Sequence, residues 1–152
     1  MDDPDPASQG GHVSEQPRQL SSLSPPAIDG AVRSAISQAI VRIHAEQYGK
    51  GATQAKTYVW DNVVVTVLRD VLTVAERTLV NIGSIDTVRD VRTKFQFGLE
   101  ETFTAAIERL TGRRVHSFMS QVDPVRGVGV EVFVLEPEPV EESVEDNGPA
   151  AA

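Results

Sequence analysis

Four basic residues occupy positions where they could bind an anion. Lys50, Lys56, Arg113 and Arg114 all lie at junctions between a predicted helix and a predicted strand. If these junctions meet at one end of a sheet, the four side chains could bind a phosphate-like anion, a nucleotide or an acidic partner. The alternative is an ordinary solvated surface, because exposed cations are common in proteins. A small anion- or nucleotide-binding regulatory domain is therefore one of two functional hypotheses.

The stretch GKGAT at 49–53 has the composition of a phosphate-binding loop. It lacks the spacing of the Walker motif, and it does not lie between a strand and the helix that follows it. The sequence therefore favours a helix end followed by a connector, with an anion site built from backbone amides as the alternative.

The remaining side chains with acid–base or metal-binding chemistry form no recognisable set. His44 and His116 have no partner nearby in the sequence, and a lone histidine is more often a packed or surface residue. Asp61 is explained by a turn, and the charged residues between 86 and 94 have the spacing of a solvated helix face. The chain has no cysteine, which excludes disulfides and thiolate metal sites. We expect no catalytic residues, no metal and no cofactor, and a protein that is not an enzyme.

The net charge of -8 is carried by the two ends of the chain. Residues 1–30 contain five acids and one base, and residues 136–152 contain six acids and no base. The stretch between them has eleven acids and thirteen bases, so its net charge is about +2. This weak charge, without basic residues interleaved with aromatic ones, argues against nucleic-acid binding.

Composition divides the chain into one foldable unit and two ends. Residues 1–28 are rich in Pro, Ser, Gln, Gly and Asp, and residues 137–152 add negative charge to a similar composition. Such segments cannot bury enough apolar surface to offset their ordering entropy, so we expect both to be disordered. A single domain over 29–136 remains. The chain start lacks a secretory pattern, and its apolar runs are far shorter than the ~20 residues of a spanning helix, so we expect a soluble, cytoplasmic protein.

The first half of the domain is predicted to be a helix followed by a hairpin. A helix over 31–48 ends at Gly49, a residue that readily adopts the left-handed conformation. The runs AKTYVW and VVVTVLR are rich in β-branched and aromatic residues. They flank Asp61 and Asn62, which suit a two-residue hairpin turn. The apolar residues with helical spacing are Val32, Ile36, Ile40 and Ile43.

The second half is predicted to contain two helices and another hairpin. Thr73 and Glu76 form a capping box for a short helix over 74–82. Apolar residues then keep helical spacing from Ile85 for about 25 residues, or ~38 Å, and Gly112 ends this helix. The segments VHSFMSQV and VGVEVFVL flank a five-residue turn and form the last two strands. Because the long helix could reach a second subunit, we expect a homodimer.

The resulting order is helix, strand, strand, helix, helix, strand, strand. It predicts an α+β fold in which two hairpins form an antiparallel four-stranded sheet with helices packed on one face. The order of the strands in the sheet stays open at this stage.

Five short motifs together resemble one known family. They are YGKG at 48–51, KTY at 56–58, LTVAERTL at 72–79, LTGR at 110–113 and EVFVLEP at 131–137. In this order, over about residues 34–137, they resemble the MpsC family, which is labelled as part of a Na+-translocating, membrane-potential-generating system. The resemblance implies an accessory or interaction protein that associates with an ion-transporting membrane complex, at most at the membrane periphery. It supplies no catalytic or binding residues.

Overall fold

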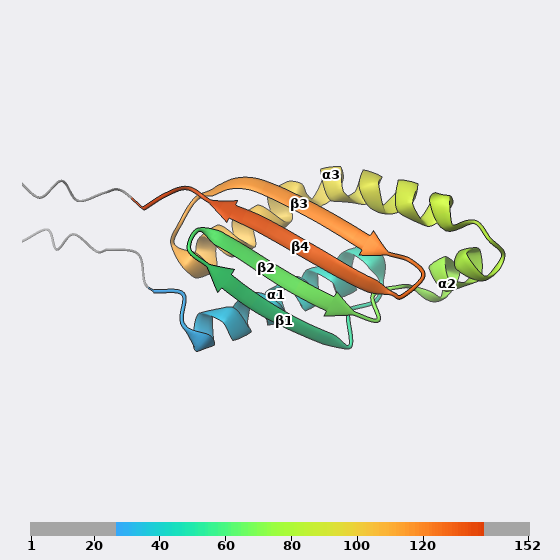
Figure 1. Cartoon of the computed structure of the whole chain (residues 1–152), viewed down its shortest axis with the longest axis horizontal. Coiled ribbons are helices and arrows are strands. Elements are labelled where there is room, and N and C mark those ends of the chain that lie inside the picture. Colours follow the sequence, from blue (N-terminus) through green and yellow to red (C-terminus); the bar gives the residue numbers. More distant parts are fainter. Residues whose placement is uncertain (1–26, 139–152) are drawn as a thin grey trace, which may run out of the picture.

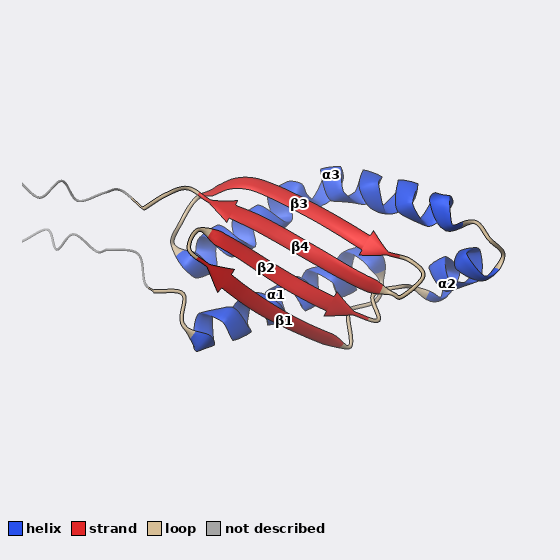
Figure 2. Cartoon of the chain, viewed as in Figure 1, coloured by secondary structure: helices blue, strands red, loops and turns tan. Residues whose placement is uncertain are grey.

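The computed structural model describes residues 27–138, so most of the two ends expected to be disordered, 1–28 and 137–152, lies outside the described residues. Three helices and four strands follow in the predicted order (Figures 1 and 2). The elements are α1 (Gly30–Tyr48), β1 (Gln54–Trp60), β2 (Val63–Arg69), α2 (Val74–Asn81), α3 (Ile85–Thr111), β3 (Val115–Asp123) and β4 (Val128–Leu135).

The four strands form one antiparallel sheet in the order β1-β2-β4-β3. The two hairpins therefore meet through β2 and β4, and β1 and β3 form the edges. Thr66 of β2 lies opposite Thr57 on one side and Glu131 on the other. The predicted α+β fold is confirmed, and α1 and α3 lie behind the same face of the sheet (Figure 2).

Alternation along the two central strands separates the core from an outer face. In β2 and β4 every second residue is buried, and the residues between them are half-buried. Successive side chains of a strand point to opposite faces, so this pattern places one face under the helices. The buried positions are Val64, Thr66 and Leu68 in β2 and Gly129, Glu131, Phe133 and Leu135 in β4.

Local signals set the ends of the elements as predicted. The Thr73 hydroxyl accepts from the Glu76 N–H at 3.2 Å, and the Glu76 carboxylate accepts from the Thr73 N–H at 2.8 Å, which completes the capping box of α2. Asp61 adopts a left-handed φ of 54° in the turn between β1 and β2. Gly49 ends α1 with a φ of 75°, so the GKGAT stretch is a helix end followed by a connector.

An aromatic stack joins α3 to the sheet at the centre of the core. The ring centroids of Phe103 and Phe118 are 5.3 Å apart, and those of Phe118 and Phe133 are 4.9 Å apart. Phe103 and Phe133 are almost fully buried. The three rings come from α3, β3 and β4, so their packing fixes the long helix over the second hairpin.

Removal of a ring from this stack should destabilise the protein strongly. We expect Phe103→Ala to lower the free energy of unfolding by about 3–5 kcal/mol, because it leaves a cavity in a closed core. Phe97→Ala, on the same helix but 73% exposed, should change it by less than about 0.5 kcal/mol. Urea unfolding followed by circular dichroism would measure both, and equal losses would contradict this packing.

Candidate functional site

The four basic residues predicted to form one cluster are divided between the two ends of the sheet. Lys50 lies where β1 begins, and its Nζ donates to the Asp70 carbonyl oxygen at 2.9 Å and pairs with the Asp70 carboxylate at 2.9 Å. Hydrogen bonds from Lys50 and Arg77 lower the pKa of the Asp70 carboxyl. Lys56 lies nearby, within β1.

Arg113 lies at the opposite end, just after α3. It donates to the Glu136 carbonyl oxygen at 2.8 Å, and its guanidinium is 3.8 Å from the Glu138 carboxylate. Arg114 is exposed beside it. The predicted common anion site is therefore corrected: α3 runs along the sheet, so the two helix-to-strand junctions fall at opposite ends.

A buried pair of ionisable side chains joins α1 to the centre of the sheet. His44 Nε2 lies 2.8 Å from Glu131 Oε1, although the two residues are 87 positions apart in the chain. Their exposed fractions are 3% and 2%. Sequence reasoning considered His44 alone and missed Glu131. The available signal was the alternation in VGVEVFVL, which places Glu131 on the same face as Phe133 and Leu135.

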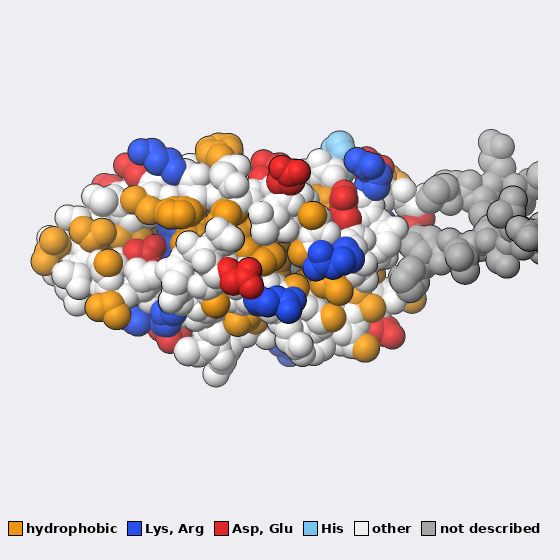
Figure 3. Space-filling view, turned by 180° about the vertical axis from the view of Figure 1, so that it is seen from behind, with side chains coloured by type: hydrophobic (Ala, Val, Ile, Leu, Met, Phe, Trp, Pro, Cys, Tyr) orange, Lys and Arg blue, Asp and Glu red, His pale blue; other side chains and the backbone are white. Residues whose placement is uncertain are grey.

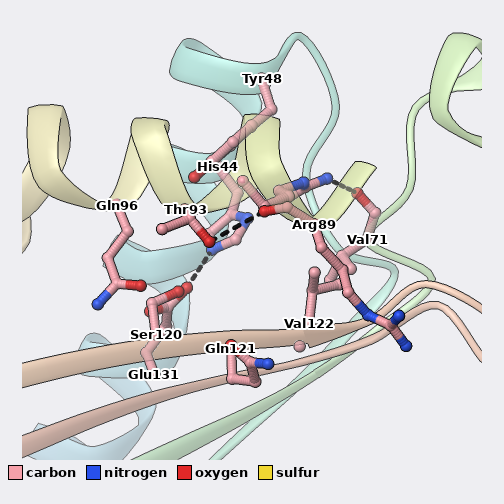
Figure 4. Close-up of a pocket in the computed structure, with 12 residues that line it drawn as sticks. His44, Tyr48, Val71, Arg89, Thr93, Gln96, Ser120, Gln121, Val122 and Glu131 are labelled. Carbon is pink, nitrogen blue, oxygen red and sulfur yellow. Dashed lines mark hydrogen bonds and ion pairs between the residues drawn. The ribbon is translucent and has the colours of Figure 1, made fainter. Parts of the chain in front are cut away.

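Each member of this pair has one polar atom that faces a small cavity. Among residues 27–138, neither Nδ1 of His44 nor Oε2 of Glu131 has a hydrogen-bond partner. Both residues line a cavity of about 40 Å³, together with Thr93 and Ser120 (Figure 4). At ~10–15 Å³ for each water, this volume suits about three water molecules. It is far below the ~300 Å³ or more of a cofactor pocket.

A second buried ion pair joins α2 to α3. Arg92 Nε donates to Glu76 Oε1 at 2.6 Å, and Arg92 Nη2 donates to Glu76 Oε2 at 2.8 Å and to the Val71 carbonyl oxygen at 2.8 Å. Burial would raise the pKa of Glu76, but hydrogen bonds from Arg92 and the Thr73 backbone outweigh it and leave the pKa below its usual 4.5. Glu76 is therefore ionised at neutral pH.

Tyr48 connects the two buried pairs. Its ring stacks on His44 at 5.1 Å between centroids, and the Arg92 guanidinium lies 4.1 Å from the ring centroid. Burial raises the pKa of the Tyr48 hydroxyl, more than the nearby Arg92 charge lowers it. The phenol is therefore neutral at physiological pH. The Tyr48 ring therefore contacts both an imidazole and a guanidinium. Through it, the His44–Glu131 pair and the Glu76–Arg92 pair form one continuous set of contacts in the core.

The donor set of this region does not suit a metal ion. Within residues 27–138, no three or more His, Asp or Glu side chains gather closely enough to hold one. None of the helices in this range is long and apolar enough to cross a membrane.

These features define the class of the protein: a small α+β domain whose buried pairs of polar side chains tie its helices to each other and to its sheet. The chain belongs to the MpsC family, because the family model described as "Na+-translocating membrane potential-generating system (MpsC)" matches residues 29–137. No curated protein and no solved structure matches the chain.

Removal of one member of the His44–Glu131 pair should lower the free energy of unfolding more than replacement of both members. We expect Glu131→Ala to lower the free energy of unfolding by about 3–5 kcal/mol, because His44 is left buried without its partner. The double change His44→Phe with Glu131→Leu should recover most of that loss. Glu136→Ala, at an exposed site just after β4, is the matched control. A double variant less stable than Glu131→Ala would contradict a bracing role.

The Glu76–Arg92 pair should contribute to stability only above acidic pH. Since the folded pKa of Glu76 is lowered, its contribution is complete above the unfolded value near 4.5 and is lost as pH falls through the folded pKa. We expect Glu76→Gln to cost about 3 kcal/mol at pH 7 and progressively less below pH 4.5. Urea unfolding from pH 7 to pH 3 tests this, with Glu100→Gln on the exposed face of α3 as control. If the difference in free energy of unfolding between the wild-type chain and Glu76→Gln did not change with pH, this role of the ion pair would be refuted.

Proposed function

We propose that the protein is a non-enzymatic accessory component of a Na+-translocating, membrane-potential-generating system, and that it works as a homodimer. Family membership supports the association with such a system. The uncovered apolar face of the sheet carries the proposal of an interaction protein. The helices lie on the opposite face (Figure 1), so this surface is available for contact with another protein.

Apolar side chains dominate this outer face. Tyr58 and Trp60 of β1 stack at 5.6 Å between centroids and are 37% and 60% exposed. Met119 of β3 is 49% exposed on the same face. An exposed apolar patch of this extent is typical of a protein interaction site. The central strands contribute Val63, Val65 and Val67 from β2 and Val128, Val130, Val132 and Val134 from β4.

A second copy of the chain is the occupant that fits this face best. The β2 and β4 valines are uncharged, so the centre of the face can pack against a second copy without burying an unpaired charge. The cations of this face, Lys56 and Arg69, lie toward the end where β1 begins. Sheets pack face to face at ~10 Å with their strands within ~30° of each other. Seven residues along each of four strands give a flat area of about 23 by 19 Å. Two such faces have a combined flat area of about 870 Å², to which the relief of the side chains adds, whereas a small specific interface buries ~1,200 Å².

The helix side of the molecule remains free in such a dimer. Figure 3 shows hydrophobic side chains at the end of the molecule formed by α2 and the start of α3. Val74 and Ile82, at the two ends of α2, are 77% and 70% exposed, and Phe97, in the middle of α3, is 73% exposed. This second apolar surface suits contact with a subunit of the ion-translocating system. α2 packs against α3, and the contact of α3 with a second copy stays a prediction.

The alternative of an anion- or nucleotide-binding regulator has lost its main support. Lys50 and Arg113 are at opposite ends of the sheet and are engaged by Asp70 and by Glu136 and Glu138. The four residues proposed for that function therefore do not form one site.

A charge placed at the centre of the outer face should dissociate the dimer. We expect Val132→Lys to raise the dimer dissociation constant by about 100-fold, because each interface would bury an unpaired ammonium group at two places. Val125→Lys, in the turn between β3 and β4 and 61% exposed, should leave it unchanged. Light scattering over a concentration series measures the mass, and circular dichroism verifies folding. A wild-type chain that stays monomeric would refute the dimer.

Association with the transport system is tested by capture from the native membrane. The tagged full chain is crosslinked mildly in its own host, the membrane fraction is solubilised, and the captured partners are identified by mass spectrometry. We expect enrichment of an integral-membrane transport subunit, reduced by Phe97→Glu on the exposed α3 surface but not by Arg114→Glu. Recovery of the protein alone, or of unrelated enzymes, would overturn the accessory role.

A further inference from the structure

The two edge strands of the sheet differ in whether a side chain of the protein already forms hydrogen bonds with their outward-facing backbone groups. At the β3 edge, the Gln96 amide lies against the backbone of Ser120. In the orientation that satisfies both atoms, its nitrogen donates to the Ser120 carbonyl oxygen at 2.8 Å and its oxygen accepts from the Ser120 N–H at 3.2 Å. β1 is the other edge, and within residues 27–138 no side chain pairs with its backbone in this way. An edge strand of this kind can accept an added strand.

A groove of about 560 Å³ runs beside this open edge, between α1 and β1. Small side chains on both walls make it hollow, with Ser34 and Ser37 on α1 and Ala55 on β1. Hydrogen-bonded hydroxyls fix its floor: Ser37 Oγ lies 2.7 Å from Thr57 Oγ1, which lies 2.9 Å from Thr66 Oγ1. The groove is therefore built into the packing of α1 on the sheet.

The groove is positively charged. Arg33, Arg42 and Lys56 line it, and no Asp or Glu is among its lining residues. In the described part of the chain, none of these three side chains forms an ion pair. Each new pair with a carboxylate would add a modest energy, and the combined field would speed the encounter with an anionic ligand.

We propose that this groove binds an extended acidic peptide segment of a partner protein, which adds as a strand to β1. Main-chain hydrogen bonds to the edge provide affinity, and the carboxylate side chains on the helix side of the added strand reach Arg33 and Arg42 of α1. Lys56 points to the other face of the sheet, where its Nζ lies 5.2 Å from the centroid of the Tyr58 ring. The seven residues of β1 extend over ~23 Å, which sets the length of the segment at about seven residues. The inference rests on the proposed accessory role, because it names the chemistry by which the protein recognises its partner.

Fluorescence anisotropy with a labelled octapeptide of alternating Glu and Val, added to the purified full chain, tests this proposal. We expect saturable binding that weakens with salt. Two further peptides carry N-methyl groups on alternate backbone nitrogens. The peptide whose methylated nitrogens would donate to β1 should not bind, and the peptide whose methylated nitrogens point away from β1 should still bind. The double change Arg33→Glu with Arg42→Glu should weaken binding by about tenfold or more. Arg114→Glu, at the far end of the sheet, should change it less than about twofold. Circular dichroism verifies that the variants fold.

Three results would overturn the proposal. The first is equal binding of the peptide with Gln in place of Glu, and the second is equal binding to the Arg33→Glu/Arg42→Glu chain. The third is binding seen only when the chain's own acids after β4 are neutralised, which would assign the groove to that segment. These acids are Glu141, Glu142, Glu145 and Asp146.

The assay also separates this proposal from the accessory role. Lost peptide binding with transport subunits still captured from the membrane rejects the groove alone. Peptide binding without capture of those subunits rejects the accessory role alone.

Discussion

The structure depends on one constraint: a four-stranded sheet has two faces, and the helices cover only one of them. The alternation in β2 and β4 places every second side chain on the covered face. α1 and α3 bury that face, whereas α2 is short and packs on α3. The apolar outer face follows from this topology, because the valines between the buried positions necessarily point the other way. A sheet with a valine-rich uncovered face is suited to an interaction with another protein.

The covered face is not wholly apolar, and its polar residues determine how the helices sit. Glu131 is buried in the middle of β4, where a carboxyl group without a hydrogen-bond partner would be strongly destabilising, and His44 of α1 provides the partner at 2.8 Å. Arg92 of α3 donates to the buried carboxylate of Glu76 and thereby fixes α2 against α3. Since Tyr48 lies between the two pairs, the positions of all three helices are linked. The position of α1 in turn fixes the groove beside β1.

Sequence reasoning predicted the parts of this structure that depend on local interactions. The capping box of Thr73 and Glu76, the turn at Asp61 and the seven elements in order all follow from residues close together in the chain. The strand order does not, because two hairpins can join through any pair of edges. The position of Lys50 relative to Arg113 depends on that order and on the direction of α3, so their separation could not be read from spacing.

The His44–Glu131 pair also shows that local sequence patterns do not predict contacts between distant elements. Half of it was visible in the sequence, since a Glu among alternating apolar residues implies a buried carboxyl group that needs a hydrogen-bond partner. The identity of the partner was not visible, because His44 is 87 positions away. A local pattern can therefore reveal that a polar side chain is buried, whereas only the packing of distant elements reveals which group forms its hydrogen bond.

The outer face and the β1 edge lie in perpendicular directions, and this geometry makes self-association and partner binding compatible. Two sheets packed face to face use their flat sides, so the β1 edge of each copy stays open to an added strand. A dimer then presents two basic grooves. Contacts between exposed charges are weak individually, but a partner with two acidic segments would bind the second at a high effective concentration. In the proposed complex, two weak contacts of this kind would therefore act together, although each groove contributes only a few cations.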